Sequence, residues 1–313
     1  ILIDHDGLNR LGYQRIYRVD EAGVVHESPP AIATTQPTLR IELAVGDAPP
    51  PPPAKAPPYV LPCSPRFGLE TKIDADLADW SGPWVALPGG QFTAIGTWNG
   101  PDDLSARLAF GYDDRYFYVA ADVTDNEHTN NHDGCLIWNG DCIQIALDPL
   151  NLGNEVGFVA NQYEIGFALR ANGEAATWQW FGKRGRPQGP VEGARVAIRR
   201  DDAIRHTYYE AAIPLEQFSP LMPAPNRRIG VCVLLADADQ SSPQREPGTE
   251  RRCHFETSPL ALTNGKHPGQ FGALEFLPPD ESQQRVVRRP SARAALVPKN
   301  TTVCLLYTSP SPR

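Results

Sequence analysis

Short runs in which apolar and polar residues alternate, each closed by a turn signal, constrain the fold of this chain more than any other feature. Such alternation places every second side chain on one face of a β-strand. It is clearest from Arg115 to Val123, from Cys142 to Asp148 and from Tyr163 to Leu169, and Asn172-Gly173 then gives a strong hairpin signal. The sequence therefore predicts antiparallel strands joined by tight turns.

About ten such strands are expected. Further ones lie at 107–110, 196–198, 208–213, 229–236 and 273–276. The 32 Pro and 26 Gly residues, against a single Met, argue against long helices and for many turns. Regularly spaced short strands are typical of two packed sheets. We expect an all-β fold, a two-sheet antiparallel β-sandwich of jelly-roll-like form with extended flanks.

Composition predicts one main domain behind a linker. Residues 1–47 hold too few apolar residues to bury a core, so we expect them to be the C-terminal remnant of a preceding domain. The tract APPPPPAKAPP from Ala48 to Pro58 favours an extended linker, which we place at 48–66. The β-sandwich is then expected from 67 to 279.

The end of the chain differs from this domain. Residues 280–303 are polar and lack a periodic apolar pattern, which indicates a linker or a disordered tail. Residues 304–313, CLLYTSPSPR, resemble a translated sequencing adaptor and are not expected to belong to the fold. Because the chain also starts at Ile1 without Met, we expect both ends to be limits of a sequenced fragment.

Charge and hydropathy argue against two classes of partner. A formal net charge of −8 argues against a nucleic-acid binder that relies on a basic surface. No run approaches the roughly 18 apolar residues of a membrane-spanning helix. Neither nucleic acid nor a membrane span is therefore expected.

Cysteine spacing leaves one question open. Once Cys304 is set aside, five of the six cysteines remain. Cys135 and Cys142 flank a short loop, which they either close with a disulfide or border as two separate buried thiols. Spacing alone does not decide between these alternatives.

Trp138 is the first candidate for a ligand contact. It stands in IWNGDCIQI, directly before the strand predicted at 142–148. An indole offers a flat apolar face that matches the C–H face of a sugar ring, and its N–H adds a donor. The alternative is that Trp138 packs in the core.

Three segments of the chain resemble family 9 carbohydrate-binding modules, the sugar-binding β-sandwiches often appended to xylanases and other secreted glycoside hydrolases. They are the block from Trp98 to Pro149, IDADLADW at Ile73 to Trp80 and QFGALEFL at Gln270 to Leu277. The resemblance implies non-catalytic binding of a polysaccharide or oligosaccharide. It also implies that the module tethers a covalently linked upstream glycoside hydrolase, or a surface protein, and that it is secreted or displayed on a bacterial cell.

The resemblance also implies a set of site residues. IWNGDCIQI is similar to the family pattern W-x-x-D-S-[VI]-E, in which the tryptophan is one wall of an aromatic clamp and the aspartate accepts sugar hydroxyls. Trp138 and Asp141 match these two positions, and Gln144 falls where the family carries glutamate. Glu164 lies near the position of a polar ligand contact, and Gln162 shares its strand face.

One family position is not matched. The second clamp tryptophan precedes the last strand, but the corresponding loop here, Leu262 to Gly272, has no aromatic residue before Phe271. Trp178, Trp180 or Trp98 is a candidate for the second wall, and packing within the sandwich is the alternative for each. Trp80 and Trp84 are expected to pack in the core or at a sheet edge.

Two other functions compete with sugar binding. A haem-binding electron-transfer domain of the DOMON type has a similar sandwich, but it would want Met and His axial ligands, and Met222 is the only methionine. A structural sandwich without ligand is the other alternative. Glu164 and Glu210 could be paired for glycoside hydrolysis, but nothing in the sequence fixes their separation.

A polar loop suggests a metal. The stretch from Asp125 to Asp133 concentrates oxygen donors, and calcium favours such ligands. Family 9 modules often carry structural calcium, so Asp125, Glu127 and Asp133 are predicted calcium ligands. His128 and His132 would suit zinc, although they lack a helical HExxH context.

Overall fold

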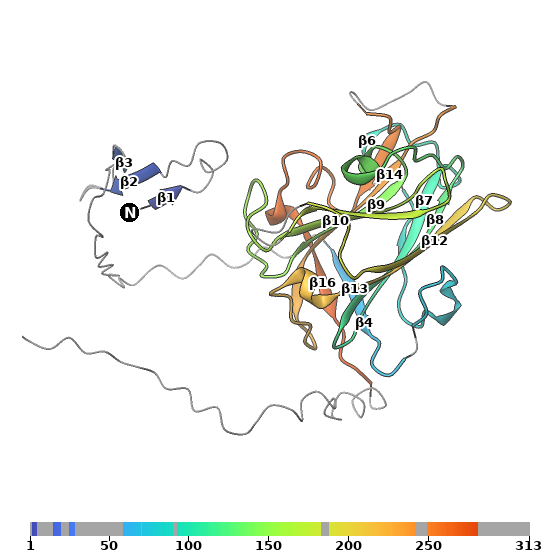
Figure 1. Cartoon of the computed structure of the whole chain (residues 1–313), viewed down its shortest axis with the longest axis horizontal. Coiled ribbons are helices and arrows are strands. Elements are labelled where there is room, and N and C mark those ends of the chain that lie inside the picture. Colours follow the sequence, from blue (N-terminus) through green and yellow to red (C-terminus); the bar gives the residue numbers. More distant parts are fainter. Residues whose placement is uncertain are drawn as a thin grey trace, which may run out of the picture. The chain divides into compact units, whose positions relative to one another are not determined.

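The computed structural model divides the chain into two compact units, 1–54 and 55–313. It describes residues 2–4, 15–19, 25–28, 59–69, 71–89, 93–182, 188–241 and 249–280. In the first unit, β1 (Leu2–Asp4), β2 (Arg15–Val19) and β3 (Val25–Ser28) form an antiparallel sheet in the order β1-β2-β3 (Figure 1). The ranges 29–58 and 281–313, including the proposed adaptor, lie outside the described residues.

The second unit is a β-sandwich, as predicted. Its thirteen strands form one hydrogen-bonded sheet. They are β4 (Val60–Pro65), β5 (Val85–Leu87), β6 (Thr93–Gly96), β7 (Leu104–Tyr112), β8 (Tyr116–Asp125), β9 (Cys142–Asp148), β10 (Tyr163–Leu169), β11 (Ala175–Phe181), β12 (Arg195–Asp201), β13 (His206–Pro214), β14 (Arg228–Asp237), β15 (Cys253–Glu256) and β16 (Gly272–Phe276). The main path runs β11-β10-β9-β14-β16-β4-β7-β8-β13-β12, with β15 joining β14 to β6 and β5 beside β7.

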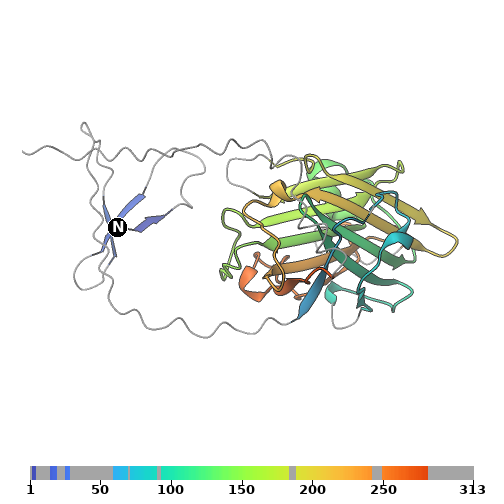
Figure 2. The ribbon, with the colours of Figure 1, turned by 90° about the horizontal axis from the view of Figure 1, so that it is seen from below.

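This sheet folds over itself into two layers around a common core (Figures 1 and 2). The core contains apolar side chains from β7, β8 and β13 together with side chains from β9, β10 and β14. The helices of the described residues are short 3-10 turns at Leu77–Asp79, Gly134–Asn139, Leu215–Phe218 and Pro268–Gln270. Among the described residues, no helix has the length and apolar character needed to cross a membrane.

Strand alternation separates the two faces of each layer. In β9, Ile143, Ile145 and Leu147 point into the core, while Gln144 takes the opposite face. In β10, Ile165 and its alternate neighbours do the same. The register then aligns Gln144, Gly166 and Trp178 across β9, β10 and β11 on the outer face of the layer.

One strand departs from the antiparallel pairing of the rest of the sandwich. β4 pairs in parallel with both β16 and β7. Alternation specifies which side chains share a face but not the direction of the partner strand. The connection from β4 to β7, residues 66–103, is long enough for the crossover that a parallel pair requires.

The predicted start of the domain at 67 was also wrong. β4 lies within the predicted linker 48–66, and its Leu61 and Cys63 are buried in the core. The Tyr59 hydroxyl donates a hydrogen bond to the Val231 carbonyl at 2.7 Å. The sandwich therefore includes residues from Tyr59 onward.

The described cysteines are all free thiols, with Cys135 exposed and Cys142 buried. The structure therefore excludes the disulfide. Of the two thiols, Cys142 is buried as the alternative expected and Cys135 is not.

Trp80 is buried and donates a hydrogen bond to Glu210 Oε1 at 2.6 Å. Trp98 donates to the Leu104 carbonyl at 2.9 Å and contacts the core, so it packs within the sandwich.

Candidate functional site

A cavity of about 410 Å³ brings together four of the predicted site residues, Trp138, Gln144, Glu164 and Trp180. Trp138 comes from the 3-10 turn Gly134–Asn139, and the other three come from β9, β10 and β11. The remaining lining residues are Cys135, Leu136, Phe181, Gln188, Arg251, Leu262, Thr263 and Lys266. Two indoles therefore line one cavity, although the family position for a second tryptophan is not matched.

Trp180 lies over a glycine of the neighbouring strand. A Cβ atom at Gly166 would come within 2.5 Å of the Trp180 ring. The Trp180 Nε1 donates to the Cys135 carbonyl at 2.9 Å, which ties the indole to the turn that carries Trp138. Because Gly166 has no side chain, the Trp180 indole can lie against this strand and line the cavity.

Trp138 contacts a cation that the sequence did not predict as a site residue. The Arg251 guanidinium lies over its indole, 5.2 Å from the ring centroid. Arg251 is 6% exposed, so little of its side chain is in contact with solvent. This is a cation–π contact, which occupies one face of the Trp138 ring.

One carboxylate oxygen of Glu164 has no hydrogen-bond partner among the described residues. Its Oε1 accepts a hydrogen bond from Lys266 Nζ at 2.6 Å, whereas its buried Oε2 has no partner among the described residues. Burial raises the pKa of the Glu164 carboxyl, and Lys266 opposes that shift. Within the described part of the chain, the Gln144 side-chain amide donates a weak hydrogen bond to Cys142 Sγ at 3.5 Å. Glu164 and Gln144 thus offer polar groups beside two indoles.

Three predicted contacts lie outside the cavity lining. Asp141 is buried and accepts hydrogen bonds from the backbone N–H groups of Thr129 and Ala238, so it joins two loops. Gln162 precedes β10 and holds its loop through Val159 and Asn154. Trp178 packs against the small apolar cluster around Ile137.

The catalytic pairing of Glu164 with Glu210 is not formed. Glu210 does not line the cavity. Its carboxylate accepts hydrogen bonds from the backbone of Asp74 and Ala75 and from the Trp80 indole. Its role is therefore structural.

The haem alternative has no support. Met222 is 71% exposed, and it lines a separate cavity whose described lining residues include no histidine.

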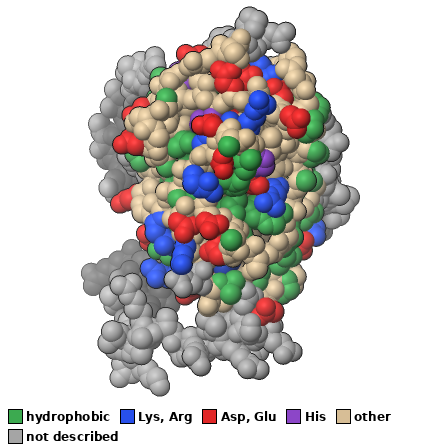
Figure 3. All heavy atoms as spheres, turned by 90° about the vertical axis from the view of Figure 1, so that its right-hand side faces the viewer, with side chains coloured by type: hydrophobic (Ala, Val, Ile, Leu, Met, Phe, Trp, Pro, Cys, Tyr) green, Lys and Arg blue, Asp and Glu red, His purple; other side chains and the backbone are tan. Residues whose placement is uncertain are grey.

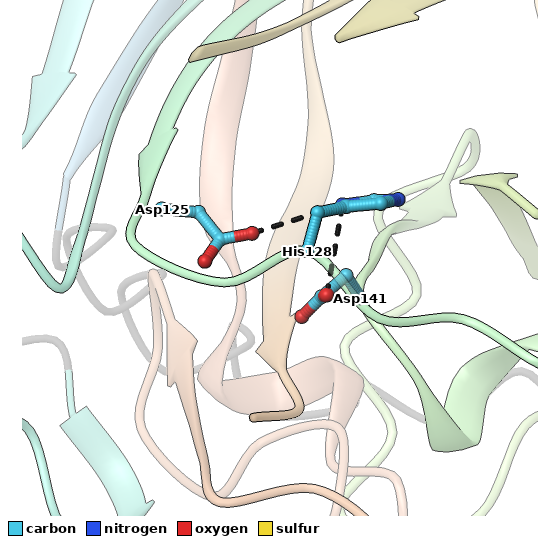
Figure 4. A group of neighbouring side chains, drawn as sticks. All are labelled: Asp125, His128 and Asp141. Atoms are coloured by element: carbon cyan, nitrogen blue, oxygen red, sulfur yellow. Dashed lines mark ion pairs between the residues drawn. The ribbon is translucent and has the colours of Figure 1, made fainter. Parts of the chain in front are cut away.

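The predicted calcium ligands do not form one group. Asp125 lies near His128 and Asp141, where His128 Nδ1 is 3.7 Å from Asp125 Oδ2 and 3.6 Å from Asp141 Oδ2 (Figure 4). Glu127 instead accepts hydrogen bonds from Ser241, and Asp133 caps the 3-10 turn and pairs with Arg170 at 3.0 Å. His128 and His132, the residues of the zinc alternative, do not share a candidate metal group among the described residues, and His132 lies 3.0 Å from Glu250.

Asp125 belongs to a second group with Asp237 and Asp239. Arg252, 1% exposed, pairs with both of these and with Asp103. Burial raises the pKa of Asp237 to about 7 and that of Asp239 to about 6; the Asp125 carboxylate adds to both shifts and Arg252 opposes them. One oxygen of each, Oδ1, is buried without a partner among the described residues. This group offers the oxygen donors that calcium prefers.

The comparisons with known proteins agree with this fold. A family model described as "Carbohydrate family 9 binding domain-like" matches residues 78–251. Among solved structures, a family 9 carbohydrate-binding module from Caldicellulosiruptor kristjanssonii in complex with cellotriose aligns with a TM-score of 0.52 at 17% identity, covering 78% of this chain and 100% of that one. A module from the same organism in complex with glucose gives 0.51 at 17% identity, covering 71% and 98%.

No curated protein matches the chain. At 17% identity the two solved structures show only that the fold is shared, whereas the family model shows which family the chain belongs to. Family 9 consists of non-catalytic binding modules, in keeping with the cavity of indoles and hydrogen-bonding groups. Because the model matches more than half of its 313 residues, this chain belongs to the family 9 carbohydrate-binding domain-like proteins, which bind sugars and do not cleave them.

Proposed function

We propose that the cavity on the outer face of β9, β10 and β11 is the sugar-binding site, with Trp138 and Trp180 as its aromatic walls. The observation that carries this proposal is the buried Oε2 of Glu164, which has no hydrogen-bond partner among the described residues and lies beside two indoles. Buried polar atoms normally have hydrogen-bond partners, and a sugar hydroxyl would supply one. The volume of about 410 Å³ falls within the range of roughly 300 to 1,000 Å³ typical of small-molecule sites.

Glucose and short β-glucans are the first ligands to test. The two similar modules are in complex with cellotriose and glucose. Calorimetry with cellotriose should show binding to the full chain and a loss of about 1 to 3 kcal/mol in Trp138→Ala and in Trp180→Ala, as for other aromatic stacking platforms. Trp84→Ala removes a half-buried indole outside the cavity lining and serves as the matched control. Unchanged affinity in both cavity variants would move the site elsewhere.

We further propose that binding tethers a covalently linked glycoside hydrolase or surface protein to polysaccharide, and that the protein is secreted by a bacterium or displayed on its surface. A polysaccharide too large to enter a bacterial cell must be bound outside it, which supports that location. On the face of the molecule in Figure 3, acidic and basic side chains are interspersed, so that face offers no broad basic area for nucleic acid.

We also propose that Asp125, Asp237 and Asp239 hold a structural calcium ion. A calcium ion would neutralise these carboxylates, and two buried oxygens that have no partner in the described ranges, Asp237 Oδ1 and Asp239 Oδ1, support this assignment. Asp125, Asp103, Asp237 and Asp239 together outnumber the neighbouring guanidinium groups of Arg200 and Arg252.

Thermal melting with calcium and with a chelator tests this site. Calcium should raise the melting temperature, because a ligand of the native state stabilises it by mass action. The response should disappear in Asp239→Asn and persist in Asp102→Asn, which changes an exposed carboxylate. Identical melting curves with calcium and with chelator would show that Arg200 and Arg252 balance these carboxylates without a calcium ion.

A further inference from the structure

We propose that His128, Asp125 and Asp141 bind a divalent transition metal ion, and that the ion is Zn²⁺. This site is separate from the sugar cavity and does not depend on the proposed function. It also differs from the proposed calcium group, because only Asp125 belongs to both groups. The His128 imidazole lies beside the buried carboxylates of the other two residues (Figure 4).

One ring nitrogen of His128 lies close to both carboxylates. Its Nδ1 is 3.7 Å from Asp125 Oδ2 and 3.6 Å from Asp141 Oδ2. This nitrogen is buried and has no hydrogen-bond partner in the described part of the chain. Asp125 and Asp141 are 2% and 3% exposed, so little of either carboxylate is in contact with solvent. Buried polar atoms normally have a partner, and a metal ion would supply one to all three groups.

The other ring nitrogen of His128 identifies the tautomer. Nε2 lies 2.9 Å from the Leu169 carbonyl oxygen, which can only accept a hydrogen bond, so Nε2 is the donor. In the neutral imidazole Nδ1 then carries the lone pair, and neutral imidazole is the form that binds metal ions. A histidine that binds a metal almost always donates its second N–H to a carbonyl, a carboxylate or water. The contact with Leu169 therefore holds His128 as it would hold a metal ligand.

A proton on His128 Nδ1 is the alternative to a metal ion. An imidazolium N–H would donate to a carboxylate oxygen at about 2.7 to 3.2 Å, and both observed separations are longer. Two ligand atoms that share a tetrahedral zinc ion, each about 2.0 to 2.2 Å from it, lie about 3.4 Å apart. The separations of 3.6 and 3.7 Å are nearer to this value. The geometry therefore fits a shared ion better than a shared proton.

The ligand types select the metal. Imidazole nitrogen suits zinc and other transition metals, whereas calcium takes oxygen ligands. Three protein ligands leave the fourth position of a tetrahedral zinc ion to water. Arg200 lies 3.6 Å from Asp125 Oδ2 and balances part of the charge there, whereas Asp141 accepts hydrogen bonds from backbone N–H groups, which carry no net charge. A zinc ion would supply the remaining positive charge.

Zinc titration of the full chain, without a polyhistidine tag, tests the inference. The buffer contains calcium, which competes for groups built from oxygen ligands alone. We expect the chain to bind a single zinc ion under these conditions. X-ray absorption at the zinc edge then identifies the ligands, and we expect an imidazole nitrogen among oxygen atoms. Both measurements use the unmodified chain and do not depend on the folding of a variant.

Variants locate the bound ion. His128→Ala should weaken zinc binding at least about tenfold, because the loss of a residue that merely orients a metal ligand already costs about 10- to 100-fold. His132→Ala removes a histidine of the same loop that lies outside this group, and it should leave zinc binding unchanged. Asp239→Asn should also leave it unchanged, since Asp239 belongs to the calcium group alone. Calorimetry measures each affinity, and circular dichroism checks that each variant is folded.

The inference would be overturned if the unmodified chain took up no zinc, or if oxygen atoms alone held the ion. Equal affinity in the folded His128→Ala variant and the parent chain would also overturn it. An equal loss in His132→Ala would place the ion at the other histidine. If Asp239→Asn lost zinc and His128→Ala retained it, the ion would lie in the calcium group, and the inference would fail.

Discussion

The guanidinium of Arg251 and the indole of Trp138 lie one over the other, with 5.2 Å between the guanidinium carbon and the ring centroid. A ligand that stacks on Trp138 must therefore use the other face of the indole or displace the guanidinium. Trp180 lines the same cavity and offers a second aromatic surface. The site thus combines two indoles with a cation, where the family pattern implied a clamp of two tryptophans.

Gly166→Ala should weaken sugar binding through Trp180. The new methyl group would come within 2.5 Å of the indole and force it to move, at a cost of about 1 to 3 kcal/mol for overpacking. Calorimetry with cellotriose measures the effect. Gly189→Ala is the matched control, because a Cβ atom there meets nothing within 4 Å.

A double-mutant cycle tests whether Trp180 transmits this effect. Once Trp180 is replaced by alanine, adding Gly166→Ala should cost little further affinity. If the two losses simply add, Gly166 acts on the ligand by another route.

The affinity for a neutral sugar should fall with acidification. Burial raises the pKa of Glu164 above its ordinary value of 4.5, so the carboxylate takes up a proton at a higher pH than an exposed glutamate. The ionised form accepts hydroxyl groups and pairs with Lys266, and both contacts weaken as the pH falls through that pKa. Cellotriose titrations across pH should show this loss, and Glu164→Gln should flatten the profile. An unchanged profile in Glu164→Gln would assign the pH dependence to another group.

The Glu164 carboxyl should make the fold more stable at low pH, whereas it makes sugar binding weaker there. The folded-state pKa exceeds the unfolded value, so the protonated form stabilises the fold at low pH, and this contribution is lost as the pH rises through the raised pKa. Near neutral pH, Glu164→Gln should therefore unfold at a higher temperature than the parent chain. A lower melting temperature would mean that the ion pair with Lys266 outweighs the cost of burial.

The part of the site that lies on regular strands was predictable from the sequence. Alternation in β9 and β10 put Gln144 and Glu164 on the face opposite the core, and the Asn172-Gly173 turn placed β11 beside them with Trp180 on the same face. Arg251 and Lys266 were not predicted. They reach the cavity from irregular segments on either side of β15, whose positions depend on tertiary pairing and leave no periodic signal.

β4 was missed for a different reason. Its sequence, VLPCSP, follows a proline-rich tract and itself contains two prolines, which argue against a strand inside a sheet. In the structure Pro62 is paired with Glu275 of β16 and lies outside the pairing with β7, whereas Pro65 is the last residue of the β7 pairing and ends the strand. The prolines therefore favoured a linker at a segment that is a strand, with side chains in the core.

Cys135 should report on ligand binding. It is the exposed thiol among the described cysteines and it lines the cavity, whereas burial raises the pKa of the Cys142 and Cys232 thiols to about 12 and makes them poor nucleophiles. Cellotriose at about ten times its Kd should slow alkylation of Cys135 roughly tenfold. Peptide mapping separates Cys135 from Cys304, and Cys135→Ser supplies the control. An unaffected rate would place the sugar away from this cavity.

The domain should fold and bind from Tyr59 but not from Phe67. A chain of residues 59–280 keeps every described strand of the sandwich, and we expect it to melt cooperatively and to bind cellotriose as the full chain does. A chain of residues 67–280 loses β4, which leaves the facing edges of β16 and β7 without their partner. It also removes the buried Leu61, whose truncation to alanine alone would cost about 2 to 5 kcal/mol. We therefore expect this shorter chain to be insoluble or to melt without cooperativity. Equal melting temperatures for the two chains would show that β4 contributes nothing to the fold and would restore the boundary at 67.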